Sequence, residues 1–191
     1  KNQKLYYHRL GAAQSADQLV YQRPDHPDWG MGGGVTEDGR YLVIGVSLGT
    51  DSRNRVYYLD LGNARRPRIR GTVVRLLDAF DATYDFVGNL GPVFYFRTNL
   101  DAPRSRLIAI DTRRPGRDAW REIVPQGRDV LEGVALIGGR FVASYMQDAH
   151  SRLSVFDTAG TPLADIALPA PGAVSGLSGR ADSPEMFYAF T

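Results

Sequence analysis

The residues Arg55-Val-Tyr-Tyr-Leu-Asp60 begin with arginine, end with aspartate and hold large apolar residues between them. The same pattern recurs in Arg106-Leu-Ile-Ala-Ile-Asp111 and in Arg152-Leu-Ser-Val-Phe-Asp157, at intervals of 51 and 46 residues. Repeats of this length, built on β-branched and aromatic residues, are typical of β-propeller blades. The repeat therefore predicts an all-β chain of four-stranded antiparallel blades.

Short runs of strand-forming residues alternate with glycine, proline, aspartate and asparagine along the chain, which indicates antiparallel hairpins. No segment keeps a helical period over ten or more residues. Aligning the repeats predicts a partial β-propeller within residues 1–191, with three whole blades and a partial blade at each end. The predicted bounds are 5–25 and 173–191 for the partial blades, and 32–78, 84–125 and 130–169 for the whole ones.

The repeat also has a physical explanation. Alternate residues of a strand face opposite sides, and stacked blades cover both sides of the third strand, so bulky residues are favoured at every central position. We expect each closing aspartate to accept hydrogen bonds from backbone N–H groups of the next turn. Each opening arginine is expected to pair with an acidic residue of a neighbouring strand. We interpret these residues as scaffold and not as catalytic groups: Arg55, Asp60, Arg106, Asp111, Arg152 and Asp157.

The composition excludes several classes of function. The chain has 23 basic and 21 acidic residues, so its formal net charge of +2 predicts neither nucleic-acid nor membrane binding. It has no cysteine, which excludes disulfides, thiolate metal sites and a cysteine nucleophile. The compartment stays unknown, with cytoplasmic and periplasmic locations both open.

No residue pattern points to a catalytic centre. The histidines His8, His26 and His150 lack metal-ligand spacing, so we expect neither a metal nor a cofactor. The string Val174-Ser-Gly-Leu-Ser-Gly179 lacks the G-x-S-x-G pattern of a nucleophile elbow. The run Gly30-Met-Gly-Gly-Gly34 is interpreted as a tight start of an innermost strand, or as a place where a peptide approaches the backbone closely.

Several motifs, taken in order, resemble the propeller domain of the prolyl oligopeptidase (prolyl endopeptidase) family. The resemblance covers nearly the whole chain, and the collinear order of the motifs makes it specific. Its clearest parts are Tyr6-Tyr-His-Arg-Leu-Gly11, Pro24-Asp-His-Pro-Asp-Trp29, Thr36-Glu-Asp-Gly-Arg-Tyr-Leu42, Asp129-Val-Leu-Glu132 and Phe187-Tyr-Ala-Phe-Thr191.

The resemblance implies a two-domain serine peptidase. Its α/β-hydrolase domain carries a Ser-Asp-His triad and cuts after proline, and its seven-bladed propeller admits only short peptides. This chain would be a central part of the propeller, without the triad and inactive alone. Its expected partners are the hydrolase domain of the same parent chain and short proline-containing peptides. This number of blades does not close a ring, so we expect the ends to form a homodimer through exposed blade edges, to swap strands or to rearrange.

The resemblance also implies residues that line the substrate cavity: Met31 or its neighbour Gly30, Ser47 and Thr50. The family often has arginine where Ser47 stands and cysteine where Thr50 stands. Two other functions remain open from the residues alone. One is a scaffold module that binds protein partners on its rim. The other is oxidoreductase or lyase chemistry at the propeller axis, which requires a cofactor and is disfavoured by the few histidines.

Overall fold

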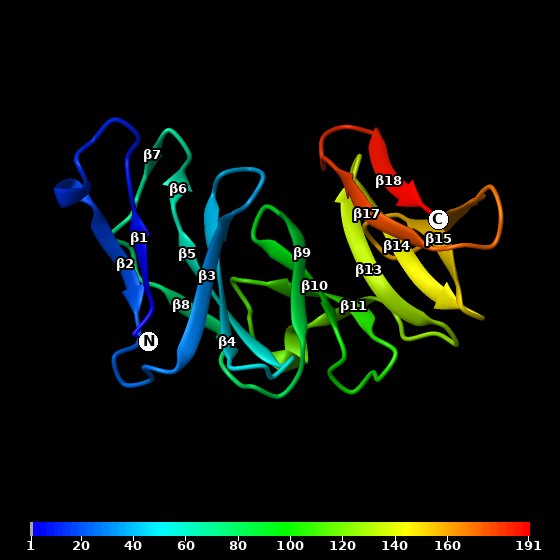
Figure 1. The fold of residues 1–191 in the computed structure, drawn as a ribbon, viewed down its shortest axis with the longest axis horizontal. Coiled ribbons are helices and arrows are strands. Elements are labelled where there is room, and N and C mark those ends of the chain that lie inside the picture. Colours follow the sequence, from blue (N-terminus) through cyan, green and yellow to red (C-terminus); the bar gives the residue numbers. More distant parts are fainter. Residues whose placement is uncertain (1) are drawn as a thin grey trace. The chain divides into compact units, whose positions relative to one another are not determined.

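The computed structural model describes residues 2–191, and their regular secondary structure is almost entirely β-strand (Figure 1). The helices of the described chain are two short 3-10 turns, Gln14–Ala16 and Arg117–Ala119. Neither has the length or the apolar character that a membrane-crossing helix needs. The chain divides into two compact units between Thr83 and Tyr84.

The first unit contains a four-stranded antiparallel sheet of order β3-β4-β5-β8. The hairpin β1-β2 precedes this sheet, and the very short hairpin β6-β7 lies in the connection from β5 to β8. The strands are β1 (Lys4–Tyr7), β2 (Gln18–Gln22), β3 (Trp29–Val35), β4 (Tyr41–Leu48), β5 (Asn54–Asp60), β6 (Gly62–Asn63), β7 (Arg66–Pro67) and β8 (Val74–Leu77).

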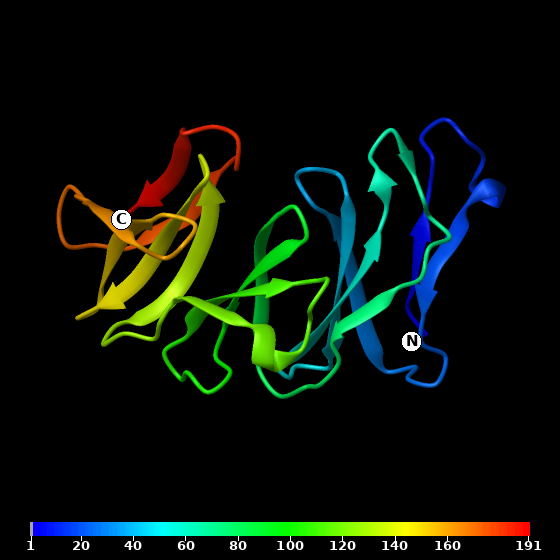
Figure 2. The same ribbon diagram turned by 180° about the vertical axis from the view of Figure 1, so that it is seen from behind.

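The second unit contains two four-stranded antiparallel sheets, β9-β10-β11-β12 and β13-β14-β15-β16, and a final hairpin β17-β18; Figure 2 shows them from behind. The strands are β9 (Tyr84–Leu90), β10 (Val93–Thr98), β11 (Arg106–Asp111), β12 (Arg121–Val124), β13 (Val130–Ile137), β14 (Arg140–Gln147), β15 (His150–Phe156), β16 (Pro162–Ile166), β17 (Val174–Gly179) and β18 (Met186–Phe190).

The predicted all-β chain of four-stranded antiparallel sheets is confirmed. The division into blades with the bounds given above stays a prediction. The strand β3 begins at Trp29, before the start at residue 32 that the sequence suggested, so the whole glycine run lies within the strand. The hairpin β6-β7 was not expected, and it delays the fourth strand of that sheet until Val74.

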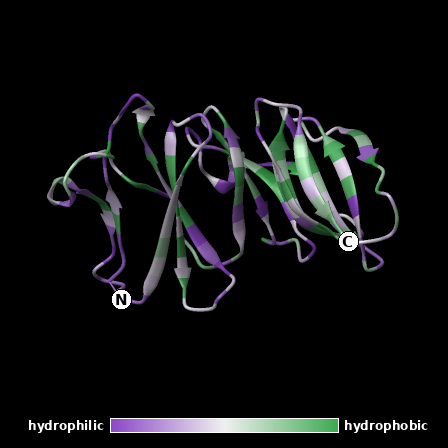
Figure 3. Ribbon diagram, turned by 45° about the horizontal axis from the view of Figure 1, so that its top comes forward, coloured by the Kyte–Doolittle hydropathy of each residue, from purple (hydrophilic) through white to green (hydrophobic). Residues whose placement is uncertain are grey.

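The third strand of each four-stranded sheet is buried on both faces. In β5 the residues from Val56 to Leu59 are each at most 8% exposed, and in β11 the residues from Leu107 to Ile110 are at most 2% exposed. Burying one such large apolar side chain stabilises the fold by about 1.5–3 kcal/mol. Figure 3 shows that hydrophobic segments lie within many of the strands, with hydrophilic residues in many of the connecting turns.

The two four-stranded sheets of the second unit share one hydrophobic core. Tyr95 of β10 meets Phe141 of β14 edge to face, with ring centroids 4.8 Å apart, and Leu107 and Phe156 belong to the same cluster. Such edge-to-face aromatic pairs add about 0.5–1.5 kcal/mol beyond their buried area. Side chains from two different sheets therefore stabilise each other, as the stacking of propeller blades requires.

A glycine allows a close approach between these two sheets. Gly160 lies in the β15-β16 turn with φ +94°, and a Cβ atom built there would lie 1.8 Å from the carbonyl oxygen of Ile123 in β12. Gly139 in the β13-β14 turn also has a positive φ, +68°, but a Cβ there meets no atom within 4 Å.

Alanine substitutions at these two glycines distinguish the cost of backbone strain from the cost of a steric clash. We expect Gly139→Ala to lower the free energy of unfolding by about 1–2 kcal/mol, the cost of a left-handed non-glycine residue. Gly160→Ala is expected to cost clearly more, because the β15-β16 turn must also move away from β12. Urea unfolding of both variants measures the difference, and equal losses would show that the two sheets do not approach as closely as described.

Candidate functional site

The register of β3 and β4 decides which of the expected cavity residues lie together. Gly30 pairs with Ser47, and Met31 pairs with Val46. Residues directly opposite each other in an antiparallel pair point to the same face of the sheet. Ser47 therefore shares a face with Gly30, and the side chain of Met31 lies on the other face.

The face with Ser47 is lined by glycine. A Cβ atom added to Gly32, Gly34 or Gly45 would meet no atom within 4 Å, so there is room above the backbone of β3 and β4. At Gly30 a Cβ atom would lie 2.6 Å from the Ser47 hydroxyl oxygen, so that hydroxyl occupies the space of a missing side chain. An extended peptide can approach such a surface closely, and Ser47 offers it a hydroxyl donor and acceptor.

The opposite face belongs to the core of the first unit. Met31 is only 9% exposed, and its backbone N–H donates a hydrogen bond of 2.8 Å to the Gln3 side chain. Leu5 of β1 packs against Gly33, where a Cβ atom would lie 3.1 Å from its methyl carbon. The strand β1 therefore covers the face that carries Met31.

Thr50 lies in the turn that follows β4. The Asp51 N–H donates to the Leu48 carbonyl at 3.1 Å, and Thr50 itself is exposed. Arg53 hydrogen bonds to Asp51 through its side chain and its backbone N–H, which lowers the pKa of Asp51 to about 2. The structure thus brings Ser47, Gly30 and Thr50 to one end of the β3-β4 hairpin, but the side chain of Met31 lies on the face opposite to that of Gly30 and Ser47.

The opening arginine of each repeat pairs with a carboxylate of the outermost strand or just beyond it. Arg55 donates to Asp78 at 2.6 Å, and Arg106 donates to Glu122 at 2.9 Å. Arg152 lies 3.4 Å from Asp165 and 3.5 Å from Asp129, which precedes β13. These pairs join the third and fourth strands at one end of each sheet.

The closing aspartate of each repeat accepts hydrogen bonds in the next turn. Asp60 accepts from the Gly62 N–H at 2.8 Å, and Asp111 accepts from the Arg113 N–H at 3.0 Å. Asp157 accepts from the N–H of Thr161 at 2.8 Å, and this bond, with those from neighbouring backbone groups, lowers its pKa. The pKa of Asp111 falls to about 2, mainly through its hydrogen bonds with the Arg113 side chain.

Arg55 is also the centre of an aromatic cluster that the sequence did not reveal. Its guanidinium carbon lies 4.4 Å from the ring centre of Trp29 and 4.4 Å from that of Phe80. Tyr57 donates to Asp78 at 2.6 Å, and burial together with this bond raises the pKa of Tyr57 to about 12. The signal for this cluster was weak, because Asp78 lies 23 residues from Arg55 and outside the repeated six-residue pattern.

The histidines do not form a metal site. His8 follows β1 and lies 2.5 Å from Asp17, and His26 stacks on Trp29 with ring centres 3.9 Å apart. His150 begins β15. Among residues 2–191 no group of three or more histidine, cysteine or acidic side chains is placed to hold a metal ion.

A comparison with protein families matches all residues, 1–191, to the N-terminal β-propeller domain of prolyl oligopeptidase. The prolyl endopeptidase of Elizabethkingia meningoseptica is 31% identical over 188 residues, which cover 98% of this chain and 26% of that protein. Prolyl oligopeptidase A of Amanita bisporigera is also 31% identical, over 98% of this chain and 24% of its own length. The chain thus spans about a quarter of the relatives it matches.

Solved structures that resemble this chain belong to the same family as these relatives. A structure from a study of two prolyl endopeptidases and their inter-domain dynamics has a TM-score of 0.89 and 36% identity, over 99% of this chain and 27% of its own. Prolyl oligopeptidase B from Galerina marginata, bound to a 35mer hydrolysis and macrocyclization substrate, has a TM-score of 0.89 and 26% identity, over 99% of this chain and 26% of its own. The predicted propeller fold and family resemblance are confirmed.

The Asp78 carboxylate supplies a test of the Arg55 cluster. Burial alone would raise its pKa, but the hydrogen bonds from Tyr57 and Arg55 outweigh burial and lower it. The ionised form therefore stabilises the fold above the ordinary aspartate pKa of about 4, and this contribution is lost as the pH falls through the lowered value. Asp78→Asn should cost about 1 kcal/mol at about pH 7, a modest figure because the side chain is partly exposed.

Urea unfolding of Asp78→Asn and of the unchanged chain at several pH values measures the gap between their free energies of unfolding. We expect the gap to narrow below about pH 4, where the unfolded chain begins to bind the proton. Glu185→Gln is the control, because Glu185 is exposed and forms no ion pair within the described residues, and it should leave stability unchanged. A gap that is as wide at about pH 3 as at neutral pH would contradict the assignment.

Proposed function

Because the chain belongs to the prolyl oligopeptidase family and matches its N-terminal β-propeller along its whole length, we propose that it filters peptide substrates for a proline-specific serine peptidase. The cleavage itself is assigned to an α/β-hydrolase domain of the same parent chain. The observation that carries the proposal is the match of all residues, 1–191, to this one domain. The relative from Galerina marginata binds a 35mer hydrolysis and macrocyclization substrate, which supports a peptide as the molecule that meets the propeller.

The residues of this chain would bind short peptides and exclude folded proteins. None of them would form a covalent bond to the substrate. The glycine-lined face of β3 and β4 offers room for an extended peptide, and the Ser47 hydroxyl is in reach of a peptide that approaches Gly30. Both strands belong to a hydrogen-bonded sheet whose third strand is buried at its four central residues, Val56 to Leu59. A packed sheet of this kind does not deform easily. A flexible peptide can therefore pass along its surface, whereas a folded protein is too wide to enter a cavity with such a wall.

The division of labour between the domains is directly testable. We expect the full parent chain, with its hydrolase domain, to cleave short peptides after proline. Its rates should fall steeply with substrate length and be lowest for folded proteins. The 191-residue chain alone should not cleave them, because it carries no triad. Chromatography of peptide products measures both activities. Cleavage traced to residues 1–191 alone would overturn the proposal, and a full chain without proline-specific cleavage would favour the scaffold function.

The face that carries Ser47 supplies a second test. We expect Ser47→Arg in the full chain to lower KM for proline-containing peptides by about tenfold, because a guanidinium opposite Gly30 can donate to peptide carbonyls. The kcat should hardly change, since the reacting bond is elsewhere. Ser178→Arg on the exposed strand β17 is the control for added charge. An unchanged KM in Ser47→Arg would show that this face does not line the substrate cavity.

A further inference from the structure

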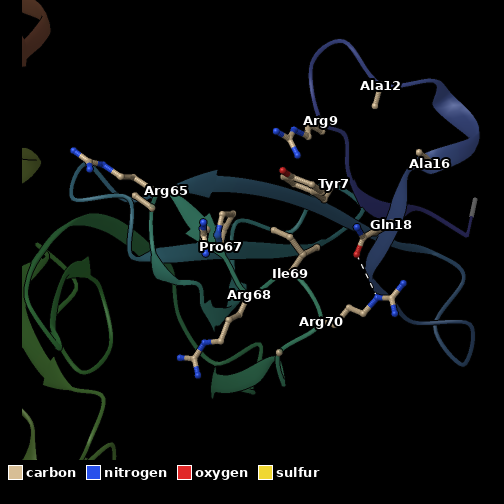
Figure 4. A pocket seen from close by; sticks show the side chains of 13 residues that line it. Tyr7, Arg9, Ala12, Ala16, Gln18, Arg65, Pro67, Arg68, Ile69 and Arg70 are labelled. Atoms are coloured by element: carbon tan, nitrogen blue, oxygen red, sulfur yellow. Dashed lines mark hydrogen bonds between the residues drawn. The ribbon is translucent and has the colours of Figure 1, made fainter.

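A cavity of about 1200 Å³ lies in the first unit between the segment that connects β1 to β2 and the segment that follows β5 (Figure 4). Its lining contains five arginines and no acidic residue. Tyr7, Gln18, glycine, alanine, proline and isoleucine complete the lining. The arginines are Arg9, Arg65, Arg66, Arg68 and Arg70.

The positive charge of this lining is largely uncompensated. Within the described chain, Arg9, Arg65 and Arg66 are exposed and form no ion pair. Arg70 donates to the neutral Gln18 side chain at 3.3 Å. Arg68 lies 3.9 Å from Asp60, whose other oxygen is 3.3 Å from Arg40. One carboxylate is thus shared between two arginines, and the remaining guanidinium groups face solvent.

The β6-β7 hairpin holds the arginine run in place. The Asn63 side-chain oxygen accepts from the Arg65 N–H at 2.9 Å, and the Arg68 N–H donates to the Leu61 carbonyl at 2.9 Å. The side chain of Ala64 sits against Gly39, where a Cβ atom would lie 2.7 Å away. Backbone bonds and packing therefore fix a loop whose side chains are cationic.

An apolar pocket of about 390 Å³ adjoins the arginine-lined cavity. The two cavities share Tyr7, Ala64, Pro67 and Ile69, and Figure 4 shows Pro67 and Ile69 between the surrounding arginines. The rest of this pocket is lined mainly by apolar residues of the strands β1 to β5. A ligand that fits both cavities must carry negative charge and an apolar group.

We propose that these two cavities, named here the arginine groove, bind an acidic peptide segment that places one apolar side chain in the adjoining pocket. The larger cavity exceeds the roughly 300–1,000 Å³ that hold a drug-sized ligand. Figure 4 shows Arg9, Arg65, Arg68 and Arg70 spread around the cavity and not converging on one point. Several carboxylates along a peptide match this spread better than one phosphate does, and guanidinium groups bind carboxylates through paired hydrogen bonds.

Nucleic acid fits the groove less well than a peptide. Proteins that bind single strands combine a cationic groove with aromatic platforms on which successive bases stack. The arginine-lined cavity holds one aromatic residue, Tyr7, and the adjoining pocket adds only the neighbouring Tyr6 and His8. The net charge of the whole chain is only +2, so it provides no wide positive field beyond the groove.

Fluorescence anisotropy of a labelled peptide with glutamates on both sides of one leucine tests the proposal on the full chain. We expect Arg66→Glu to weaken binding by at least about tenfold, and Arg66→Gln to weaken it less. Arg128→Glu, an equal change of charge on an exposed residue of the second unit, should leave binding unchanged. Raising the salt from about 50 mM to about 500 mM should weaken binding, because the Debye length shortens.

Two further peptides and two competitors make the outcome decisive. A peptide with glutamine for glutamate should bind at least about tenfold more weakly, and one with serine for leucine should lose several-fold in affinity. Equal losses in Arg66→Glu and Arg128→Glu would overturn the groove as the site. Displacement of the acidic peptide by tripolyphosphate or by a single-stranded oligonucleotide of equal charge, at equal or lower concentration, would overturn a peptide as its occupant. Circular dichroism confirms that each variant is folded, and the readout does not depend on peptidase activity.

Discussion

Burial of the third strand on both faces is the constraint on which the rest of this structure depends. A strand covered on one face alternates apolar and polar residues, but β5 and β11 carry buried residues at four consecutive positions. Polar groups are then excluded from the strand centre and gather at its ends. The arginine that opens each repeat and the aspartate that closes it lie at these ends, where they join neighbouring strands and turns.

The same sheet geometry produces two surfaces of different chemistry in the first unit. One end of the β3-β4 hairpin presents glycine and the Ser47 hydroxyl, with no charged group in the strand pairs Gly30–Ser47 to Gly34–Val43. The connection from β5 to β8, which makes no long strand until Val74, presents the arginines. A neutral, open face suits peptides of many sequences, whereas a cationic groove selects by charge. The two surfaces are therefore suited to different tasks in one protein.

The Arg55 cluster shows how scaffold chemistry differs from catalytic chemistry. Its groups have shifted pKa values, since the pKa of Tyr57 is raised to about 12 and the pKa of Asp78 is lowered. Both shifts move the group away from neutral pH, so neither side chain exchanges a proton under ordinary conditions. Perturbed pKa values alone thus do not mark an active site, and here they accompany the packing of Trp29 and Phe80 around a guanidinium.

The sequence alone determined the fold class and the strands of the repeats, because β5, β11 and β15 owe their pattern to burial on both faces, which is written in consecutive residues. It also indicated the family, through motifs whose order survives where single residues vary. Only the tertiary structure decided that Ser47 faces Gly30 and that Met31 lies on the covered face, because a shift of one residue in register exchanges the two faces. The structure alone also brought Asp78 to Arg55, and Arg9 to the loop of Arg65 and Arg70, because no local pattern encodes contacts between residues so far apart in the chain.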